Sequence, residues 1–591
     1  METATYVPLS AIFPGESGDF ASFCTLVKTL SRTDTIFWCA RLNLIVSNPQ
    51  NTDEGSKQRY CIGHFFDAQE IARGEQFAKA HPGATPFFRE QLLELMRWAC
   101  LLADDLPNDG KSFEDAQMRR RFLKAALMAS DLRGKRGFAG GLPVTDDHGA
   151  DRLTSIVALR DAVCGRPADI MQVLVRGDAI YRNAFPARYP NAHAQFLAAT
   201  GMTLEEYLDC VSTIDVFFGS MRPEAVTPQN WGGFELRPAR DAIPAGRQAA
   251  FDAYLRLDSQ TADELRAALW GGRGPADVNG AEPFDTKALR ERPLLRTADG
   301  RAIILDLVFH ADKATVGPLF TLTSWLRKRG EEEQAKRVFG AFGGAFEDYA
   351  NGILRAMYPE TPLLAGRLVC DLRGTMKDGN NVQIADACLN DVTKVVTFEC
   401  KARVIPEDAT REAETYREAV RERYGDDDGS NQLGRWIRDI ATGAVTPIGQ
   451  DWSRIKQVYP VLVASDERID RPGHDELFAG EFAKALEPES VLPGGFMRKG
   501  RFAVAPLTVM PIDVLELLES SVNNFRLADL LQEYAEAKQK GGHLSLHDYL
   551  AYTDGKKYRL SRSEFAARAL KLLEGVRERM FPHMPFPETP T

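Results

Sequence analysis

The sequence predicts a mixed α/β protein with a sheet-containing core between a large, mostly helical N-terminal region and a helical C-terminal extension. Apolar residues recur at helical spacing through most of the first 270 residues, as in FREQLLELMRWACLLADDL (88–106). Between 366 and 465 the chain instead alternates short apolar runs with turn residues, which is typical of strands. Past 511, amphipathic helical patterns return in IDVLELLESSV and FRLADLLQEYAEAK.

The composition is that of a globular protein with several domains. At roughly 150 residues per domain, 591 residues correspond to about four domains, or to two or three larger ones. The apolar fraction of 44% and the charged fraction of 26% exclude a collagenous, disordered or coiled-coil chain. With 73 basic and 83 acidic residues the net charge is −10, so no general nucleic-acid-binding field coats the surface. A local basic groove is still compatible with that sum.

The sequence predicts a cytoplasmic protein without a membrane partner. Its first residues, METATYVPLSAIFPGESGDF, lack a basic start, a long apolar stretch and a cleavage site. The most apolar early run, TIFWCARLNLIV, is short and contains Arg41 and Asn43, whereas a span needs about 20 apolar residues. The nine cysteines are scattered singly without a CxxC pair, which indicates free buried thiols in a reducing compartment.

Shifts in pattern divide the chain into six predicted segments. The Asp299-Gly300 turn between two apolar runs indicates a hairpin, and GGRGPADVNGAEPFD (271–285) indicates a linker. The segments are a helical accessory or targeting domain (1–270), a linker (271–288), a hairpin and helix lead-in (289–345), an α/β core (346–510), C-terminal helices (511–577) and a flexible tail (578–591). Within the core we expect a helix, three strands, a helix and a fourth strand.

The stretch IADACLNDVTKVVTFECKA (384–402) carries the candidate chemistry. Because side chains alternate along a strand, Glu399 and Lys401 point to one side, and Phe398 and Cys400 to the other. Asp386 lies on the preceding strand, and the short turn lets antiparallel pairing bring it beside Glu399. The two strands are therefore expected to place two carboxylates and one ammonium on one exposed patch.

Two neighbouring carboxylates are costly to bury unless a cation neutralises them. Mg²⁺ suits this role because it prefers carboxylate and carbonyl oxygens and keeps several waters. The lysine can then orient a metal-bound water or stabilise negative charge on a phosphate. An acid two residues before a lysine occurs five times in the chain, but only Glu399/Lys401 lies in a strand-like apolar run after a strand aspartate. The alternative is an edge strand with a solvated ion pair.

The order of elements and these positions resemble the PD-(D/E)XK nuclease superfamily, which has the restriction-endonuclease-like fold, from Phe346 to Val463. The resemblance implies a mixed sheet flanked by helices and a Mg²⁺- or Mn²⁺-dependent endonuclease. Asp386 and Glu399 match the metal-binding acids of the family, and Lys401 matches its catalytic lysine. Ala385 stands where the family often has proline.

The resemblance implies further site residues. The backbone carbonyl of Cys400 would be a metal ligand, and Glu347 on the first helix matches an acid that completes the metal site. Gln432 matches a glutamine that some branches place near the site. For both Glu347 and Gln432 the alternative is an ordinary helix-surface residue.

We therefore expect a nuclease that hydrolyses phosphodiester bonds, with DNA as the default substrate. A large accessory region and the lack of an ATPase motif suggest a prokaryotic restriction or antiviral defence effector, with a possible protein partner at the N-terminal region. The alternatives are an inactive scaffold of this fold that binds nucleic acid or a partner protein, and an RNA-cleaving enzyme. The basic runs 118–137 and 556–562 are either solvated surfaces or phosphate contacts.

Overall fold

The computed structural model covers the whole chain. It describes residues 6–16, 18–47, 54–81, 84–106, 114–138, 169–220, 233–271, 286–360, 366–406, 409, 413–425, 429–470, 474–519, 526–540, 545–553 and 563–583. The statements below concern these residues. Most of the predicted linker (272–285), the basic run 556–562 and the last eight residues of the predicted tail lie outside them.

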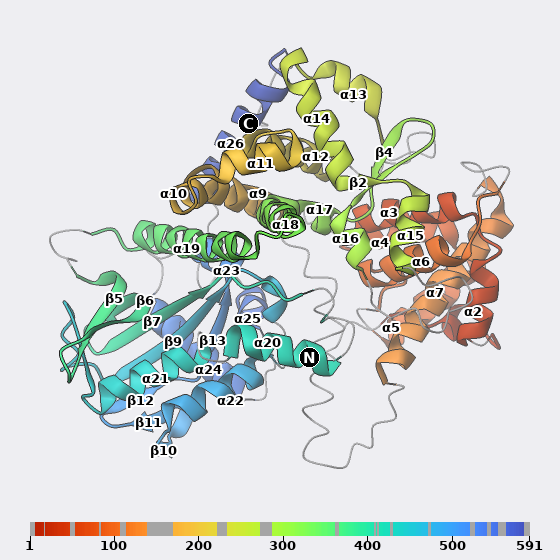
Figure 1. Ribbon diagram of the computed structural model, residues 1–591. Coiled ribbons are helices and arrows are strands. Elements are labelled where there is room, and N and C mark those ends of the chain that lie inside the picture. Colours follow the sequence, from red (N-terminus) through yellow and green to blue (C-terminus); the bar gives the residue numbers. More distant parts are fainter. Residues whose placement is uncertain are drawn as a thin grey trace.

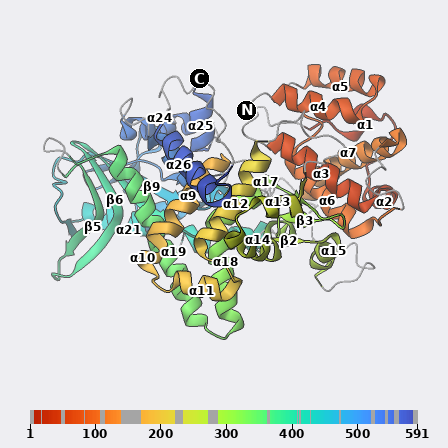
Figure 2. The same ribbon diagram turned by 90° about the horizontal axis from the view of Figure 1, so that it is seen from above.

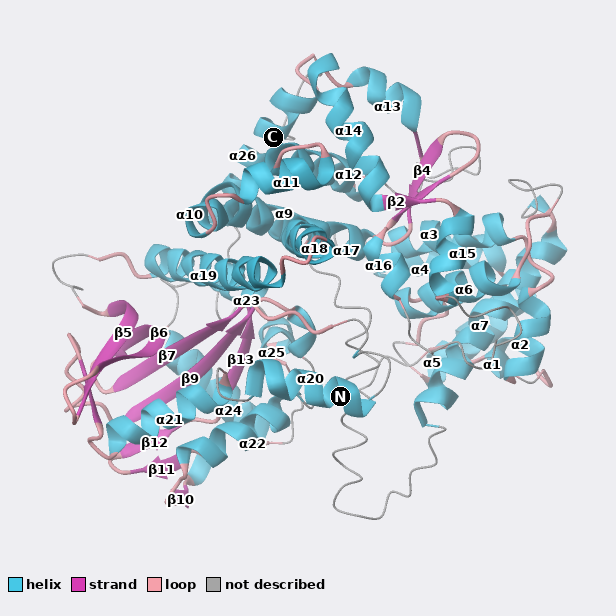
Figure 3. Cartoon of the chain, viewed as in Figure 1, coloured by secondary structure: helices cyan, strands magenta, loops and turns pink. Residues whose placement is uncertain are grey.

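A mixed nine-stranded sheet forms the centre of the C-terminal half (Figures 1 and 3). Strands β5 (Leu368–Met376), β6 (Asn381–Asp391) and β7 (Lys394–Lys401) are antiparallel neighbours, and β9 (Gln457–Ala464) runs parallel to β7. The strand order is β10-β11-β12-β9-β7-β6-β5-β8, with β13 also beside β9. The shorter strands are β8 (Val445–Pro447), β10 (Ser490–Val491), β11 (Met497–Lys499), β12 (Phe502–Val504) and β13 (Thr508–Pro511).

Helices cover both faces of this sheet, as Figures 1 and 3 show. On one face Phe398 of β7 shares a core with Phe346 of α19 (Glu332–Met357). On the other face Val395 shares a core with Ile437 of α21 (Ser430–Ala441). Beside α21 lie α20 (Ala413–Val420) and α22 (His474–Leu486). Because odd and even positions of β7 face different helices, the strand reads as a continuous apolar run in the sequence.

The predicted order of helix, three strands, helix and strand is confirmed by α19, β5, β6, β7, α21 and β9. Three boundaries differ from the sequence-based expectation. The two helices predicted on either side of residue 346 are one 26-residue helix, α19, since its apolar face continues without a break. The run FAVAPLTVM, whose apolar pattern predicts one strand, forms two strands, β12 and β13. The last helix continues to Met580, past the predicted start of the tail at 578.

The described part of residues 1–270 is mostly helical, as predicted, and forms two groups (Figure 1). The first comprises α1 (Leu9–Ile12), α2 (Phe20–Val27), α3 (Arg32–Ser47), α4 (Glu54–Phe65), α5 (Ala68–Ala80), α6 (Arg89–Leu102) and α7 (Ala116–Phe138). The second comprises α9 (Ile170–Ala179), α10 (Phe185–Arg188), α11 (Ala192–Thr200), α12 (Leu204–Gly219), α13 (Leu236–Ala242) and α14 (Ala245–Asp258). The next helix, α15 (Ala262–Trp270), packs against α6 of the first group.

The predicted hairpin links these helical groups to the rest of the chain. Strands β3 (Leu294–Arg296) and β4 (Arg301–Ile304) pair antiparallel, and Gly300 takes the positive φ of 83° that the turn requires. The hairpin also pairs with β1 (Phe234–Glu235) and β2 (Ser259–Gln260), so strands from before and after residues 272–285 share one four-stranded sheet. Helices α16 (Lys287–Glu291), α17 (Leu307–Ala311) and α18 (Lys313–Lys328) flank the hairpin.

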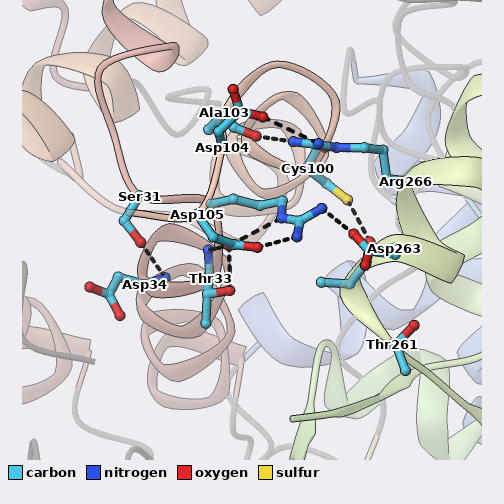
Figure 4. A network of polar contacts seen from close by, with 12 residues as sticks. Ser31, Thr33, Asp34, Cys100, Ala103, Asp104, Asp105, Thr261, Asp263 and Arg266 are labelled. Atoms are coloured by element: carbon cyan, nitrogen blue, oxygen red, sulfur yellow. Dashed lines mark hydrogen bonds and ion pairs between the residues drawn. The ribbon is translucent and has the colours of Figure 1, made fainter. Parts of the chain in front are cut away.

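Ion pairs fasten the first helical group to α15 (Figure 4). The guanidinium of Arg32 on α3 lies between Asp105 and Asp263, 2.6 Å from the latter. In return Arg266 of α15 donates to the backbone carbonyls of Cys100, at 2.6 Å, and Ala103. These contacts bring the end of α6 and the start of α15 together across more than 150 residues of sequence.

The second helical group shares a core with α19 and the C-terminal helices α23 (Ile512–Glu519), α24 (Leu527–Gln539), α25 (Leu546–Tyr552) and α26 (Ser563–Met580). Figure 2 shows α19 between the sheet and the helices α9 to α12. Inside this core Arg176 of α9 forms a two-pronged ion pair with Glu516 of α23, at 2.8 and 2.9 Å. The hydroxyl of Tyr349 on α19 donates to the same carboxylate at 2.8 Å. Helices α9 to α12 therefore complete the packing around α19.

Among the residues that the structure describes, no helix combines the length and the apolar character needed to cross a bilayer.

Removing the carboxylate of Glu516 is expected to destabilise the protein strongly. In Glu516→Ala, Arg176 stays buried without a counter-charge and the Tyr349 hydroxyl loses its acceptor. Loss of one partner of a buried ion pair typically costs about 3–5 kcal/mol. Thermal unfolding should show a clearly lower Tm for this variant.

The matched control is Asp252→Ala, which removes the acceptor of the exposed Arg240 pair between α13 and α14. Little change in Tm is expected there, because exposed ion pairs add little stability. Equal Tm values for the two variants would show that Glu516 does not hold the shared core together.

Candidate active site

Three carboxylates occupy one row across β5, β6 and β7, at a point where the hydrogen-bonded ladders are interrupted. The β6–β7 ladder ends at the pair Ala387↔Phe398, so the next residues along, Asp386 and Glu399, face each other beyond it. On the other side the β5–β6 ladder omits the position opposite Asp386, which is occupied by Asp371. Asp371 has a positive φ of 55°, and the register of the two strands shifts one residue further on, between Leu372 and Arg373.

The carboxylate of Asp386 is buried and bonded on both oxygens. Its Oδ2 accepts a hydrogen bond from the backbone N–H of Cys400 at 2.7 Å, and its Oδ1 accepts one from Gln383 Nε2 at 3.1 Å. Burial raises the pKa of Asp386, while the Cys400 amide and the charge of Lys401 oppose the rise and the charge of Asp371 adds to it. The side chain thus ties β6 to β7 where the ladder stops.

Glu399 is the most buried acid of the cluster, with only 1% of its side chain exposed. Its Oε1 lies 2.7 Å from the ammonium of Lys401, two residues along the same face of β7. Its Oε2 is buried and accepts no hydrogen bond from any described residue. Burial and the charge of Asp386 raise the pKa of Glu399 to about 8 against the opposing effect of Lys401, and the charge of Glu347 adds to the rise.

Glu347 adds a fourth carboxylate from a different element, the middle of α19. Burial and the charge of Asp386 raise its pKa to about 7; the charge of Arg188 opposes this rise, and those of Asp348 and Asp371 add to it. These mutual effects mean that the four acids repel one another within a partly desolvated region. Glu347 itself is half-buried, so it lies between the buried pair and solvent.

The structure brings together four of the residues predicted from the sequence: Asp386, Glu399, Lys401 and Glu347. The prediction of an exposed patch is wrong, because Asp386 is only 6% and Glu399 only 1% exposed. The thiol of Cys400 lies in the apolar core, as the strand alternation predicts, so only its backbone can serve the site.

Gln432 is on the first turn of α21, half-buried. Among the described residues its side chain makes no hydrogen bond to the acids, so the structure does not join it to the cluster.

Asp371, Gln383 and Arg188 are site residues that the sequence interpretation missed. Asp371 is the last residue but one of the strand-like run GRLVCDL, and an acid at that place near a strand aspartate was a usable signal. Its left-handed backbone is not readable from the sequence. Arg188 is nearly 160 residues before Glu347, and no local pattern connects the two.

The four acids are of the ligand type that binds a hard divalent cation. Carboxylate oxygens, one of them buried without a donor, are what Mg²⁺ and Mn²⁺ prefer. The described residues contain no group of three or more His, Cys, Asp or Glu side chains already arranged around one metal position. In this arrangement the Lys401 ammonium and the Cys400 amide supply the positive neighbours of Glu399 and Asp386.

No family model, no curated protein and no solved structure matches the chain. The chemistry of the cluster therefore has to be argued from its own residues.

The raised pKa of Glu399 predicts a stability that falls with pH in metal-free protein. The ordinary value is 4.5 and the folded value is about 8, so the folded state binds the proton more tightly in this window. Stability then decreases as pH rises through it. Glu399→Gln removes the effect, so its free energy of unfolding relative to the wild type should rise between about pH 5 and about pH 9 by an amount on the order of a few kcal/mol. Thermal unfolding over this pH range should show the same trend as a growing difference in Tm.

Glu333→Gln is the matched control, because Glu333 forms an ion pair of the same 2.7 Å length with Lys336 but on an exposed helix surface. Its Tm difference from wild type should not increase with pH, since the pKa of Glu333 is lowered rather than raised. A Glu399→Gln curve parallel to wild type would contradict the buried, repelled carboxylate.

Proposed function

We propose that the chain is a metal-dependent nuclease that hydrolyses phosphodiester bonds, with DNA as its substrate. The observation that carries the proposal is the convergence of Asp386, Glu399 and Glu347 with Lys401, with the buried Glu399 Oε2 lacking a donor among the described residues. Repelling acids with strongly raised pKa values are typical of functional sites. A structural ion pair needs one acid, whereas this cluster has four.

The residues divide the work by their chemistry. Asp386 and Glu399, helped by Glu347 and by the backbone carbonyl of Cys400, would hold Mg²⁺ or Mn²⁺. A bound divalent ion supplies an activated water and stabilises charge on the phosphate. Lys401 can donate hydrogen bonds to the attacking water and to a non-bridging phosphate oxygen, because its ammonium lies on the same face as Glu399.

The layout of the chain supports a narrower proposal about its role. A nuclease with a large helical region and no ATPase motif fits a restriction or antiviral defence effector whose activity is directed from outside the sheet. Residues 1–270 would then recognise DNA or a protein partner.

The direct test is incubation of the full-length protein with plasmid DNA, linear DNA and RNA, in Mg²⁺, in Mn²⁺ and with a chelator. Cleavage of DNA that the chelator abolishes is the expected result. Cleavage of RNA alone would replace the substrate, and inactivity on every substrate would favour a scaffold that binds nucleic acid or protein without cutting.

Substitutions at Asp386 and Lys401 should separate metal binding from catalysis. Asp386→Asn keeps the size and removes a charge that holds the metal, so metal binding and cleavage are both expected to fall. Lys401→Ala leaves the acids intact and removes a preorganised donor, which typically costs about 10²- to 10³-fold in rate. Calorimetric Mn²⁺ titration beside a cleavage assay measures both effects.

The same two strands supply controls. Asp391→Asn changes a β6 acid that is paired with Arg367, and Lys394→Ala changes a β7 lysine that is paired with Asp529 and similarly shielded. Both should retain wild-type cleavage. If Asp386→Asn and Lys401→Ala also cleave at the wild-type rate, the chemistry lies elsewhere.

A further inference from the structure

Two arginine–aspartate pairs adjoin the acidic cluster on its solvent side. Arg188, the last residue of α10, bonds Asp348 through two parallel N–H···O contacts of 2.8 Å each. Arg373 of β5 donates to Asp371 at 2.9 Å. Both guanidinium groups are accessible, with 48% and 61% of their side chains exposed. The cluster itself thus ends in two exposed, positively charged forks.

Both pairs lie next to Glu347. Asp348 follows Glu347 on α19, and the charges of Asp348, Asp371 and Arg188 all act on the Glu347 carboxylate. A side chain at Gly344, one turn earlier on α19, would place its Cβ 3.3 Å from the Arg188 guanidinium. The missing side chain therefore lets Arg188 lie close against the helix that carries Glu347.

Neither pair is needed to hold the fold together. Exposed ion pairs contribute little to stability, whereas the buried Arg176–Glu516 pair, which also accepts a hydrogen bond from the Tyr349 hydroxyl, ties α9 and α23 to α19. The guanidinium N–H groups that donate hydrogen bonds to a carboxylate can donate to a phosphate in the same geometry. Each arginine can therefore exchange its aspartate for a substrate phosphate without a change of backbone.

Because the site is rich in acids, binding of a polyanion there requires cationic side chains. Five acids gather here, Asp371, Asp386, Glu399, Glu347 and Asp348, against three cations, Lys401, Arg188 and Arg373, which gives 3 − 5 = −2 when all five acids are ionised. A polyanion meets a repulsive field at such a site. The two arginines are the cations of this set that reach farthest into solvent.

We propose that Arg188 and Arg373 form a phosphate clamp that binds the DNA backbone on either side of Glu347, so that the N-terminal helices contribute directly to the active site. The clamp rests on the proposed nuclease function for its substrate. Arg188 belongs to residues 1–270, which the sequence predicts to be a separate targeting domain. The clamp gives this residue a direct role in binding substrate at the active site.

The test is fluorescence anisotropy of a labelled DNA duplex with the full-length protein, in Ca²⁺ and over a series of salt concentrations. Arg188→Ala and Arg373→Ala should each weaken binding and reduce the slope of log Kobs against log[salt] by about 1, the value of one lost phosphate contact. Arg188→Lys should restore the slope, because it keeps the charge. Arg240→Ala, which breaks a comparable exposed pair with Asp252, should change neither.

Asp348→Asn distinguishes a clamp from a merely structural pair. If Arg188 binds phosphate, freeing it from Asp348 should leave binding as tight as wild type or tighter. If Arg188 only anchors α19 through Asp348, Asp348→Asn should weaken binding as Arg188→Ala does, and that result overturns the proposal. An unchanged affinity and slope in both arginine-to-alanine variants overturns it as well.

Cleavage measured in parallel separates this proposal from the nuclease itself. Arginine-dependent DNA binding without cleavage keeps the clamp and removes the nuclease. Metal-dependent cleavage with arginine-independent binding keeps the nuclease and removes the clamp.

Discussion

The hydrogen bond from the Cys400 amide to the Asp386 carboxylate is the contact on which the candidate site depends. It forms where the β6–β7 ladder ends, so a side chain takes over the tie between the strands. An unpaired buried N–H would be costly at this position, and the carboxylate satisfies it. In return the bond fixes Asp386 opposite Glu399, in a buried position that neither acid would take alone. The break in the β6–β7 ladder and the clustering of the acids therefore occur at the same place and depend on the same hydrogen bond.

Helix α19 connects the acidic cluster to the rest of the molecule. Its apolar face covers β7, and the next residues after Glu347 contact the N-terminal half: Asp348 through Arg188, and Tyr349 through the Glu516 carboxylate that Arg176 also binds. The position of Glu347 relative to the strand acids is therefore set by helices from both halves of the chain.

The sequence predicted what depends on local pattern. Strand alternation placed Glu399 and Lys401 on one face and buried Cys400 on the other, and the run lengths predicted β5, β6, β7 and β9 in the right order. It failed where the outcome depends on packing. The burial of Asp386 and Glu399 follows from helices on both faces, which a two-strand argument does not include. The left-handed backbone of Asp371 has no signature in the sequence, and the approach of Arg188 to α19 is a contact between distant segments. The resemblance to a nuclease family stays a prediction.

The electrostatics of the cluster explain why one lysine is placed inside it. Burial and mutual repulsion raise the pKa values of Asp386, Glu399 and Glu347, so the folded state disfavours the ionised form of each acid. Lys401 offsets part of that cost because its ammonium contacts Glu399 directly. A divalent cation would supply twice the charge to the same oxygens, and the ammonium would then be free to turn to another anion. A group that stabilises the buried acids can in this way become the group that acts on a substrate, which links the stability of the fold to the chemistry proposed for it.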